Sequence, residues 1–583
     1  MNGWMNRWME HEASFSSDDT SLFYRAWLPR GQRAQRAVLF LHRGHEHSER
    51  VRPLVEALVD DDCIAFAYDA RGHGYSPGER GDAPSFAALV ADLDRFVSHI
   101  ERNYGIAASD IFIIANSVGA VVASTWLHDY ARQVRGVILA AAAFSIKLYV
   151  PLAKPALRLA LKFQPDLFVK SYIQPSMLTH DEAAAANYAQ DPLIAKAISA
   201  RILLQLADTA ERVVAQADAI DTPTLMLVAG KDLVVHQQIQ RRFFEALQSP
   251  KKQWLYLENS YHAVLYEQNM APIFAACRSF MAECFAAPVV SRQALVSAPP
   301  AITTRFPTAK HQLPLWQRSG FALQRLLLRT LGQLSDGMRV GLSQGFDSGA
   351  SLDYVYKNQA QGRLLLGATI DRGYLDAIGW RGIRQRKLQL QQLLTGLLRQ
   401  RADASSTKIL DIAAGNGRYV LEVAKRFQHQ QLELLMRDFS AENLDKIRTL
   451  HTELAIAAPL TLEQKDAFAA DSYADSHDVD IAIVSGLFEL FSDNSMVARA
   501  LDGIRRQLKP GGYLIYTSQP WHPQLNLIAH TLNSHLGGQW QMRLRSQAEM
   551  DALVAAAGGV KIDTRIGLDG IFNVSVAMFS APL

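Results

Sequence analysis

The sequence predicts two successive α/β folds, each built on a mostly parallel sheet. Short apolar runs alternate with helical patterns over about residues 10–287, and the alternation resumes over about 379–583. A proline-rich stretch with little periodicity separates these two regions. The length of 583 residues suits two to four domains. Apolar runs that end in turn signals are typical of buried parallel strands.

The composition is that of a globular protein and excludes several functional classes. Lys and Arg number 60 against 57 Asp and Glu, so the formal net charge is only +3, which does not favour a nucleic-acid partner. Three cysteines without metal-ligand spacing argue against a disulfide scaffold and against a zinc site. The N-terminus lacks the apolar core of a signal peptide, and no membrane span is indicated. We therefore expect a cytoplasmic protein without a bound metal.

Residues 1–287 are predicted to form the first domain. Its strand candidates are Ala37–His42, Cys63–Asp69, Ile111–Asn116, Val134–Ala143, Pro223–Gly230 and Trp254–Glu258. Residues 144–210 break the alternation and indicate helices only. An all-helical insertion between two strands of an open sheet predicts a cap over the carboxyl ends of the strands, where such sheets bind ligands.

Residues 288–315 hold five prolines and are predicted to be a linker. Residues 316–583 form the second predicted domain, with its core at about 405–583. Its strand candidates are Lys408–Ala414, Glu433–Phe439, Val479–Gly486, Gly512–Ser518, Lys561–Gly567 and Phe572–Phe579.

Three residues of the first domain suggest acyl transfer. Ser117 stands between a strand and a helix in Ala-Asn-Ser-Val-Gly, which approaches the G-x-S-x-G nucleophile elbow. Asp232 and His262 each follow a later strand, in the chain order nucleophile, acid, base. We expect Ser117 to attack a carbonyl, His262 to transfer the proton, and Asp232 to fix the imidazole tautomer.

The oxyanion of such a reaction requires two backbone donors. Val118 follows the nucleophile, and Gly44 lies in the loop after the first core strand. Two interpretations of the neighbouring Arg43 stay open, a substrate phosphate or carboxylate site and a solvent-facing side chain. His42, His45 and His47 could suggest a metal, but the same segment is already explained as the oxyanion loop. Asp69, Arg71 and His73 are expected to hold their turn.

The segments VLFLHRGHEHSER, AYDARGHGYSPGERG, ANSVG, GKD and SYH resemble the monoacylglycerol-lipase/lysophospholipase branch of the α/β-hydrolases. The resemblance implies an α/β-hydrolase fold with a helical cap and the cleavage of a lipid-type ester. Arg43 and His45 stand where that branch usually has glycines, and Ala115 replaces the first glycine of the elbow. A thioesterase or peptidase-type hydrolase acting on a soluble acyl substrate is the alternative.

The segment KILDIAAGNGRYV in the second domain predicts a strand, a tight turn and a helix. Asp411 ends the strand, and Ala413, Gly415 and Gly417 form a turn that lets a ligand approach the backbone. Asp438 ends the next strand, where a carboxylate would bind ribose hydroxyls. Further candidates at the strand ends are Asp466 and Ala467, placed for an adenine amino group, and Ser485.

These motifs and the turn LKPGGYLI resemble the class I S-adenosylmethionine-dependent methyltransferases, with their Rossmann-like fold. The resemblance implies S-adenosyl-L-methionine as cofactor and a sheet that ends in an antiparallel hairpin. It says little about the methyl acceptor. Upstream, Tyr354, Tyr356, Arg381 and Arg384 are candidates to cover the cofactor, or residues of an ordinary amphipathic helix. His522, after the fifth strand, is a candidate methyl-transfer base or a loop histidine.

The whole chain resembles the YnbC-like family of bacterial fusion proteins. That resemblance implies a bifunctional hydrolase and methyltransferase in phospholipid metabolism. A lipid-binding or scaffold protein with one inactive domain is the alternative of another class. Residues 149–163 of the cap and the helix after the linker combine apolar faces with Lys or Arg, so peripheral contact with the inner membrane is a further hypothesis.

Overall fold

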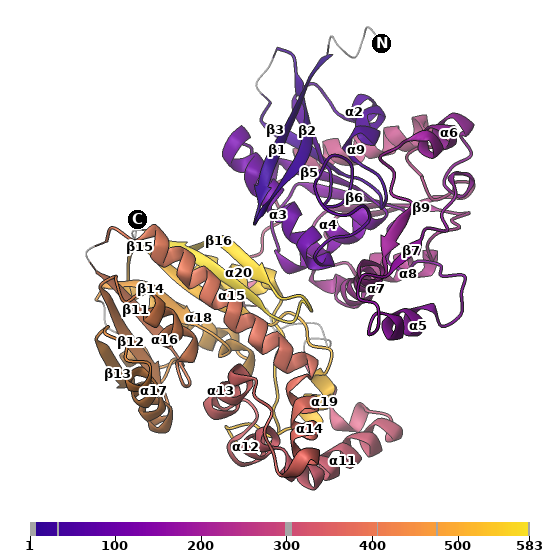
Figure 1. Ribbon diagram of the computed structural model, residues 1–583. Coiled ribbons are helices and arrows are strands. Elements are labelled where there is room, and N and C mark those ends of the chain that lie inside the picture. The colour runs from indigo at the N-terminus through magenta and orange to yellow at the C-terminus, as the bar shows by residue number, and fades with distance from the viewer. Residues whose placement is uncertain (1–6, 32–33, 298–305, 405, 474–475, 581–583) are drawn as a thin grey trace. The chain divides into compact units, whose positions relative to one another are not determined.

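The computed structural model describes residues 7–31, 34–297, 306–404, 406–473 and 476–580. The chain forms two compact units, Met1–Ser291 and Arg292–Leu583, which are coloured from indigo to pink and from pink to yellow in Figure 1. No helix of the described ranges combines the length and the apolarity needed to cross a bilayer.

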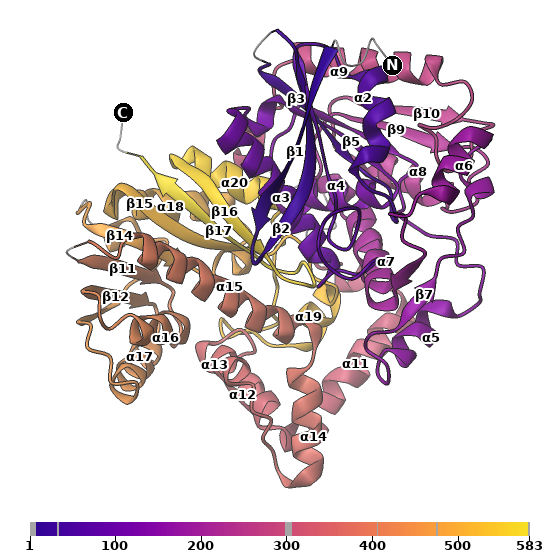
Figure 2. The ribbon, with the colours of Figure 1, turned by 45° about the horizontal axis from the view of Figure 1, so that its top comes forward.

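The first unit contains an eight-stranded sheet with the order β1-β2-β4-β3-β5-β6-β9-β10 (Figure 2). Its strands are β1 (Trp8–Ser17), β2 (Thr20–Pro29), β3 (Arg36–Leu41), β4 (Cys63–Tyr68), β5 (Ile111–Asn116), β6 (Gly136–Ala140), β9 (Thr224–Ala229) and β10 (Lys252–Leu257). β3 to β6, β9 and β10 are the predicted parallel strands. The antiparallel hairpin β1–β2 was not predicted, because many positions of β1 are exposed and polar, so no apolar run marks it.

Helices cover both faces of this sheet (Figures 1 and 2). They are α2 (Arg52–Leu58), α3 (Phe86–Tyr104), α4 (Val118–Asp129), α8 (Gln237–Ala246) and α9 (Ala271–Ala286). Leu54 of α2 and Phe280 of α9 belong to one buried cluster with Val38, Phe40 and Phe112 of the sheet. α4 starts directly behind β5, so the strand end and the helix start that carry Ser117 are both fixed by the core.

The insertion between β6 and β9 is not helical throughout, so the prediction of an all-helical cap is wrong in this respect. Its elements are α5 (Ala153–Ala160), β7 (Phe168–Lys170), α6 (Glu182–Gln190), β8 (Ala197–Ser199) and α7 (Ala200–Ala215). β7 and β8 pair antiparallel as a separate two-stranded sheet. Each strand has three residues, which is too short for an alternating pattern to be recognised in the sequence.

The second unit contains a seven-stranded sheet with the order β13-β12-β11-β14-β15-β17-β16. Its strands are β11 (Thr407–Ile412), β12 (Leu432–Asp438), β13 (Leu460–Gln464), β14 (Val479–Val484), β15 (Leu508–Ser518), β16 (Gly559–Ile566) and β17 (Asn573–Phe579). β17 pairs antiparallel with both β15 and β16, which confirms the predicted terminal hairpin. The parallel strands bring their carboxyl ends to one edge of the sheet.

The sheet of the second unit is also covered on both faces. The helices of this unit are α10 (Ala294–Ser297), α11 (Leu315–Arg329), α12 (Asp336–Gln344), α13 (Gly349–Lys357), α14 (Leu364–Leu375), α15 (Ile378–Gln400), α16 (Arg418–Arg426), α17 (Ala441–Glu453), α18 (Asn494–Gln507), α19 (Leu525–Thr531) and α20 (Gln547–Ala556). Residues of α15, α16 and α17 share a buried cluster with Ile409 of β11, whereas residues of α18 and α20 share another with Leu410. The successive side chains of β11 therefore point into opposite layers.

The described residues of the predicted linker that belong to the second unit pack against that unit. The Asn494 side chain donates to the carbonyls of Leu295 and Val296, at 3.3 and 3.4 Å. The Thr308 N–H donates to the side-chain oxygen of Asn526 at 2.7 Å. The proline-rich segment therefore has packing partners, because proline content reports restricted backbone angles and not the absence of packing.

A buried ion pair joins α4 to the cap helix α7. Both terminal nitrogens of Arg212 donate to the two carboxylate oxygens of Asp129, each at 2.7 Å. Burial raises the pKa of Asp129, but the guanidinium outweighs it and holds that pKa at about 2, below the ordinary 3.8. This pair therefore stabilises the fold fully above pH 3.8 and loses its contribution as the pH falls towards 2.

Replacing Asp129 by Ala leaves the buried Arg212 without this counter-ion. We expect the variant to lose about 3–5 kcal/mol of unfolding free energy at neutral pH, and to show a shallower loss of stability below pH 3.8. Urea unfolding of the full chain at a series of pH values measures both effects. Glu245→Ala, which breaks an exposed pair with Arg241, is the matched control and should cost less than about 1 kcal/mol. Equal losses in the two variants would contradict this account.

Candidate active sites

Ser117, His262 and Asp232 form a continuous hydrogen-bonded chain in the first unit. Nε2 of His262 lies 2.9 Å from Oγ of Ser117, and Nδ1 lies 2.9 Å from Oδ2 of Asp232. Oδ1 of Asp232 accepts from the N–H groups of Val234 and Val235. Burial raises the pKa of Asp232, but the imidazole and these N–H donors outweigh it and hold the pKa below its usual range. The carboxylate therefore stays charged and can support an imidazolium.

The backbone at Ser117 is strained in the way a nucleophile elbow requires. Its φ of 52° and ψ of −110° lie outside the ordinary regions for an L-residue. A Cβ on Gly119 would lie 2.7 Å from the carbonyl oxygen of His42 and 2.9 Å from that of Leu41, so glycine is required there. Ala115, in contrast, belongs to the extended strand β5, so its methyl group does not crowd the turn.

The two predicted oxyanion donors lie on adjoining segments. A Cβ on Gly44 would come within 2.9 Å of Cγ2 of Val118, so the loop after β3 and the start of α4 are in contact. The Ser117 N–H is already bonded to the carbonyl of Ala140 at 2.9 Å. His45 adopts a left-handed φ of 71°, a conformation that glycine adopts without strain. His45, which stands where the hydrolase branch that the sequence resembles usually has a glycine, therefore has a backbone conformation that suits glycine.

Arg43 follows neither of the two interpretations drawn from the sequence. It is buried, and its Nε and Nη2 donate to the carboxylate of Glu46 at 2.9 and 2.5 Å. Its guanidinium also lies 5.2 Å from the ring centre of Tyr266. Burial raises the pKa of Glu46, but Arg43 and Arg50 together lower it to about 2. Arg43 thus anchors the oxyanion loop from within the protein.

Two of the three histidines of this loop, His42 and His47, have hydrogen-bond partners. His42 accepts from the Ala70 N–H through Nε2, and its Nδ1 donates to the Arg43 carbonyl. Nε2 of His47 lies 2.8 Å from Asp191 of the cap. Burial lowers the pKa of His45. No group of metal-ligand residues occurs among the residues the structure describes.

The turn after β4 holds its shape through its own polar groups, as predicted. Oδ1 of Asp69 accepts from the Ser48 N–H at 2.6 Å, and Arg71 forms a buried pair with Asp92. Nδ1 of His73 donates to the Arg71 carbonyl. These residues link β4, α3 and the loop after β3. None of them belongs to the hydrogen-bonded chain of Ser117, His262 and Asp232.

The second unit has a cavity of about 660 Å³ at the carboxyl ends of its parallel strands. Six of the predicted cofactor residues line it: Ala413, Gly415, Asp438, Asp466, Ala467 and Ser485. Asp438 accepts from the Gly415 N–H at 2.8 Å and from the Ser440 N–H at 2.9 Å. These bonds hold the carboxylate against the glycine turn and leave it further acceptor capacity.

Asp411 and Gly417 do not line this cavity, but Gly417 lines an adjoining hollow of about 30 Å³ at the glycine turn. Asp411 is fully buried and accepts from the Tyr419 hydroxyl at 2.8 Å. Burial raises the pKa of its carboxyl well above the ordinary range. A Cβ on Gly417 would lie 2.4 Å from Cε of Met436. Both residues stabilise the turn through contacts with buried neighbours, Tyr419 for Asp411 and Met436 for Gly417.

The candidate covering residues upstream have mostly structural partners. Tyr354 donates to Asp371, and Nη1 of Arg384 donates to the Leu375 carbonyl at 2.8 Å. Arg381 is about half exposed. Of these four candidates, Tyr356 is the one that lines a small extension of the cavity. This extension, of about 30 Å³, reaches the glycine turn.

Arg386 is the residue that the sequence analysis missed. It is 3% exposed and lines this extension together with Tyr356 and Ser485. Its Nε and the hydroxyl of Ser485 are buried without a partner. The signal was present in α15, because Arg386 stands on the buried stripe between Ile383 and Leu390. A buried charge on an apolar stripe indicates a function or a partner.

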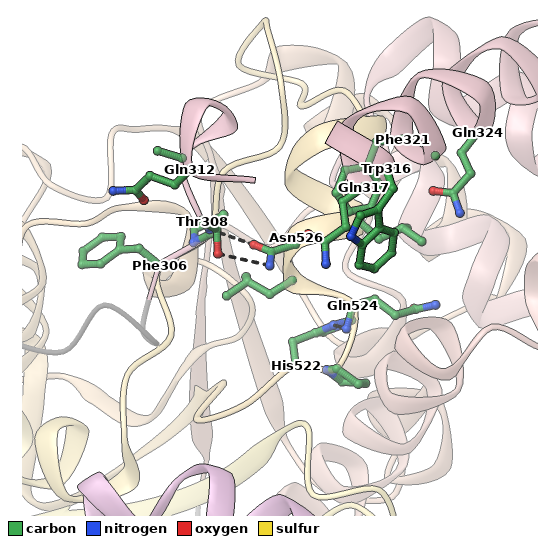
Figure 3. A pocket seen from close by; sticks show the side chains of 16 residues that line it. Phe306, Thr308, Gln312, Trp316, Gln317, Phe321, Gln324, His522, Gln524 and Asn526 are labelled. Carbon is green, nitrogen blue, oxygen red and sulfur yellow. Dashed lines mark hydrogen bonds between the residues drawn. The ribbon is translucent and has the colours of Figure 1, made fainter. Parts of the chain in front are cut away.

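His522 lies between two hollows of the second unit. It lines an open groove of about 990 Å³ with Trp316, Phe321 and Asn526 (Figure 3), and also an inner cavity. Nδ1 of His522 accepts from the Gln524 N–H at 3.0 Å, so the neutral ring carries its proton on Nε2. Burial lowers the pKa of His522 to about 4. The residue is thus placed as a hydrogen-bond donor, which argues against the predicted base.

Two family models match the chain. Residues 277–579 match a family described as "Putative methyltransferase", and residues 32–269 match one described as "Serine aminopeptidase, S33". The first unit is similar to human monoglyceride lipase, 27% identical over 43% of this chain and 82% of the relative. It is also similar to the phospholipase YtpA of Bacillus subtilis, 24% identical over 44% of this chain and 98% of the relative.

A monoacylglycerol lipase structure from Paleococcus ferrophilus matches 47% of the chain and 99% of its own length, with 23% identity and a TM-score of 0.40. The protein YnbC of Escherichia coli K12 matches both units together. It is 41% identical over 580 residues, which cover 97% of each chain. The chain therefore belongs to the YnbC family, in which an α/β-hydrolase is fused to a methyltransferase domain.

Proposed function

We propose that the first unit is a serine ester hydrolase with Ser117 as its nucleophile. The observation that carries the proposal is the unbroken chain Ser117–His262–Asp232, with both links at 2.9 Å, at a strained elbow. His262 takes the proton of Ser117 during attack and returns it to the leaving group. The N–H groups of Gly44 and Val118 stabilise the oxyanion. Water then releases the acyl group from Ser117.

The substrate that we propose is a lipid-type ester, as in a monoacylglycerol or a lysophospholipid. The names of the similar lipase and phospholipase support this class. The cap supports it independently, since no residue of α5 is buried and Leu152, Leu159 and Phe163 are 78%, 57% and 83% exposed. Thioesters and peptides remain the comparison substrates, because a triad by itself does not select among acyl groups.

A fluorophosphonate probe is expected to label the full chain at Ser117, with the label lost in Ser117→Ala. Asp232→Asn should keep the fold but lower turnover by about 10⁴, because the imidazole then lacks its fixed tautomer. A panel of monoacylglycerol, lysophospholipid, acyl thioester and amino-acid anilide, followed by mass spectrometry, measures the preference. Labelling that persists in Ser117→Ala, or cleavage of the anilide alone, would contradict the proposal.

We propose that the second unit binds S-adenosyl-L-methionine in the 660 Å³ cavity. The residues fit the group, because a carboxylate at a glycine turn suits ribose hydroxyls. The unpartnered Ser485 hydroxyl and Arg386 Nε suit the amino-acid end. When bound, this cofactor supplies an electrophilic methyl group. Asp438 orients the ribose, and Asp466 with Ala467 bounds the adenine region.

Arg386 anchors the carboxylate of the cofactor in this proposal. Its guanidinium is buried, adjoins the glycine turn and lies within about 3 Å of the Cβ position of Gly486. A hydrogen bond between two charged groups is worth about 1.5–3 kcal/mol. That energy would fix the amino-acid end of the cofactor relative to the strand end at Ser485.

Calorimetry with two ligands separates this role from a structural one. S-adenosylhomocysteine carries the amino-acid end, whereas 5′-methylthioadenosine lacks it. We expect Arg386→Gln to weaken the first about 10- to 100-fold and to leave the second unchanged. Asp438→Asn should weaken both, and Arg381→Gln is the control that weakens neither. Absence of binding to the unaltered protein would overturn the cofactor assignment, and equal losses for both ligands would overturn the carboxylate role.

Peripheral membrane contact and phospholipid metabolism complete the proposal. In α11, as in the cap, exposed apolar side chains adjoin basic ones: Leu315, Trp316 and Leu326 are 77%, 73% and 58% exposed. Such faces bind anionic bilayers through burial of apolar area and charge attraction. The three cysteines are buried and unpaired, which suits a cytoplasmic location at the inner membrane.

Sedimentation with phosphatidylglycerol vesicles tests this contact. The double variant Leu159→Glu/Phe163→Glu should reduce the bound fraction several-fold, since each change removes apolar area and adds a repelled charge. Leu568→Glu, at another exposed leucine, should bind like the unaltered protein. The idea fails if the unaltered protein stays in the supernatant, or if the control loses as much binding as the double variant.

A further inference from the structure

The second unit contains an inner cavity of about 340 Å³ that adjoins the proposed cofactor cavity. Asp347, Leu352, Gly486 and Leu490 line both. Gly486 is the second residue after β14, so this shared wall lies at the carboxyl end of a central strand. A ligand in the inner cavity would therefore lie beside a ligand in the cofactor cavity.

Most of the inner cavity is formed by aromatic and aliphatic side chains. The aromatic ones are Phe346, Tyr374, Trp380, Trp540 and Phe572, and Met338, Ile383 and Met542 are among the others. Trp380 and Trp540 are 6% and 8% exposed. The apolar lining selects a ligand with an apolar body, because burying that body is the main favourable contribution to binding.

One pair of opposite charges lies in this apolar wall. Nη1 of Arg386 lies 3.4 Å from Oε1 of Glu489, and both residues are buried. Burial raises the pKa of Glu489 in spite of Arg386 and Arg545 nearby. Asp347 also lines the cavity, so the lining contains two carboxyl groups and one guanidinium. Burial raises the pKa of Asp347, but its hydrogen bonds outweigh burial and hold that pKa below the usual range. An anionic ligand would meet these carboxyl groups without a surplus cation. The wall therefore favours a neutral ligand.

Several polar groups line the cavity, including the unpartnered Tyr374 hydroxyl, Gln519 Oε1 and Trp540 Nε1. Two others, Glu489 and His522, suit a hydroxyl on that ligand. Glu489 is an acidic residue of the lining, and His522 offers its Nε2 hydrogen because Nδ1 already accepts from Gln524. An alcohol or phenol oxygen can donate to the first group and accept from the second. Its deprotonation requires a base, which a carboxylate with a raised pKa can provide.

We propose that this cavity is the methyl-acceptor site, that it takes a neutral apolar molecule bearing a hydroxyl, and that Glu489 receives the hydroxyl proton. The inference rests on the proposed methyltransferase function. The acceptor oxygen forms a bond to the methyl carbon, the methyl–sulfur bond breaks, and its electron pair stays on sulfur. The proton moves to Glu489, so the products are a methyl ether and a neutral thioether.

The open groove described above gives room for a longer apolar tail. His522, Gln524 and Leu527 line both the groove and the inner cavity. Figure 3 shows Trp316 and Gln317 of α11 together with Gln524 among the side chains that line the groove. Because His522, Gln524 and Leu527 form a wall that the groove and the inner cavity share, we expect the alkyl chain of a longer acceptor with its hydroxyl at Glu489 to pass them into the groove.

Binding is measured first, by calorimetry of the full chain saturated with S-adenosylhomocysteine. The probes are 1-octanol, 4-butylphenol and octanoate, so that aliphatic and aromatic hydroxyl compounds are distinguished from an acid of similar size. We expect at least one hydroxyl probe to bind ten-fold or more tightly than octanoate. If octanoate binds as tightly as the hydroxyl probes, the proposal that the acceptor is neutral is overturned.

A steric variant locates the site. Gly373 lines the cavity, and a Cβ there would meet no atom within 4 Å, so Gly373→Phe can place its ring at the cavity without a backbone clash. It should weaken the hydroxyl probe at least ten-fold and leave S-adenosylhomocysteine unaffected. Gly396→Phe is the matched control, since Gly396 is also a helix glycine with open space at its Cβ position. Equal probe binding in both variants would overturn the location.

Glu489→Gln tests the chemistry. With S-adenosyl-L-methionine and the bound hydroxyl probe, mass spectrometry should show a methyl gain that falls at least 100-fold in this variant, while the probe still binds. Glu453→Gln, at an exposed position of α17, should keep the full rate. An unchanged rate in Glu489→Gln would overturn the base. Failure of S-adenosylhomocysteine to bind would overturn the proposed function, whereas its binding without any probe binding would overturn this inference alone.

Discussion

Both sites depend on a sharp backbone turn at the carboxyl end of a buried parallel strand. In the first unit the turn is Ser117, with φ 52°, between β5 and α4. In the second it is the run after β11, where Ala413, Gly415 and Gly417 have φ values of 54°, 57° and 62°. These conformations are costly or restricted to glycine. They persist because the strand before and the helix after each turn are fixed in a close-packed core.

Charge compensation is the second constraint, and it assigns different roles to buried arginines. Arg43 and Arg212 each donate two short hydrogen bonds to one carboxylate. Arg43 thereby holds a loop in place, and Arg212 holds two helices together. Arg386 has a longer contact with Glu489 and an Nε without a partner. A buried guanidinium with an unused donor can take up a ligand anion. Nη1 of Arg43 is also without a partner, so the feature that marks the candidate cofactor site is the place of Arg386, which lines the hollow at the glycine turn.

The proposed acceptor site follows from the same reasoning applied to a cavity. An apolar wall that contains the ion pair of Arg386 and Glu489 and the further carboxyl group of Asp347 admits a neutral, apolar molecule and penalises an acid. The tautomer of His522, set by the Gln524 N–H, removes the obvious base and leaves Glu489. Methyl transfer needs alignment of acceptor and donor more than it needs many catalytic groups, and the wall at Gly486 adjoins both cavities.

The sequence by itself determined the two α/β units, the parallel strands, the terminal hairpin and the chain order of the candidate triad, because each depends on local patterns and chain order. Only the tertiary structure decided which residues contact these polar side chains. Arg43 turned inward to Glu46, Asp411 was buried beneath the proposed cofactor cavity, and Arg386 reached the glycine turn in place of Arg381 or Arg384. The strands β7 and β8 and the packed α10 also required it. Periodicity reports which face of an element is buried, whereas the partner of a buried polar group depends on residues far away in the chain.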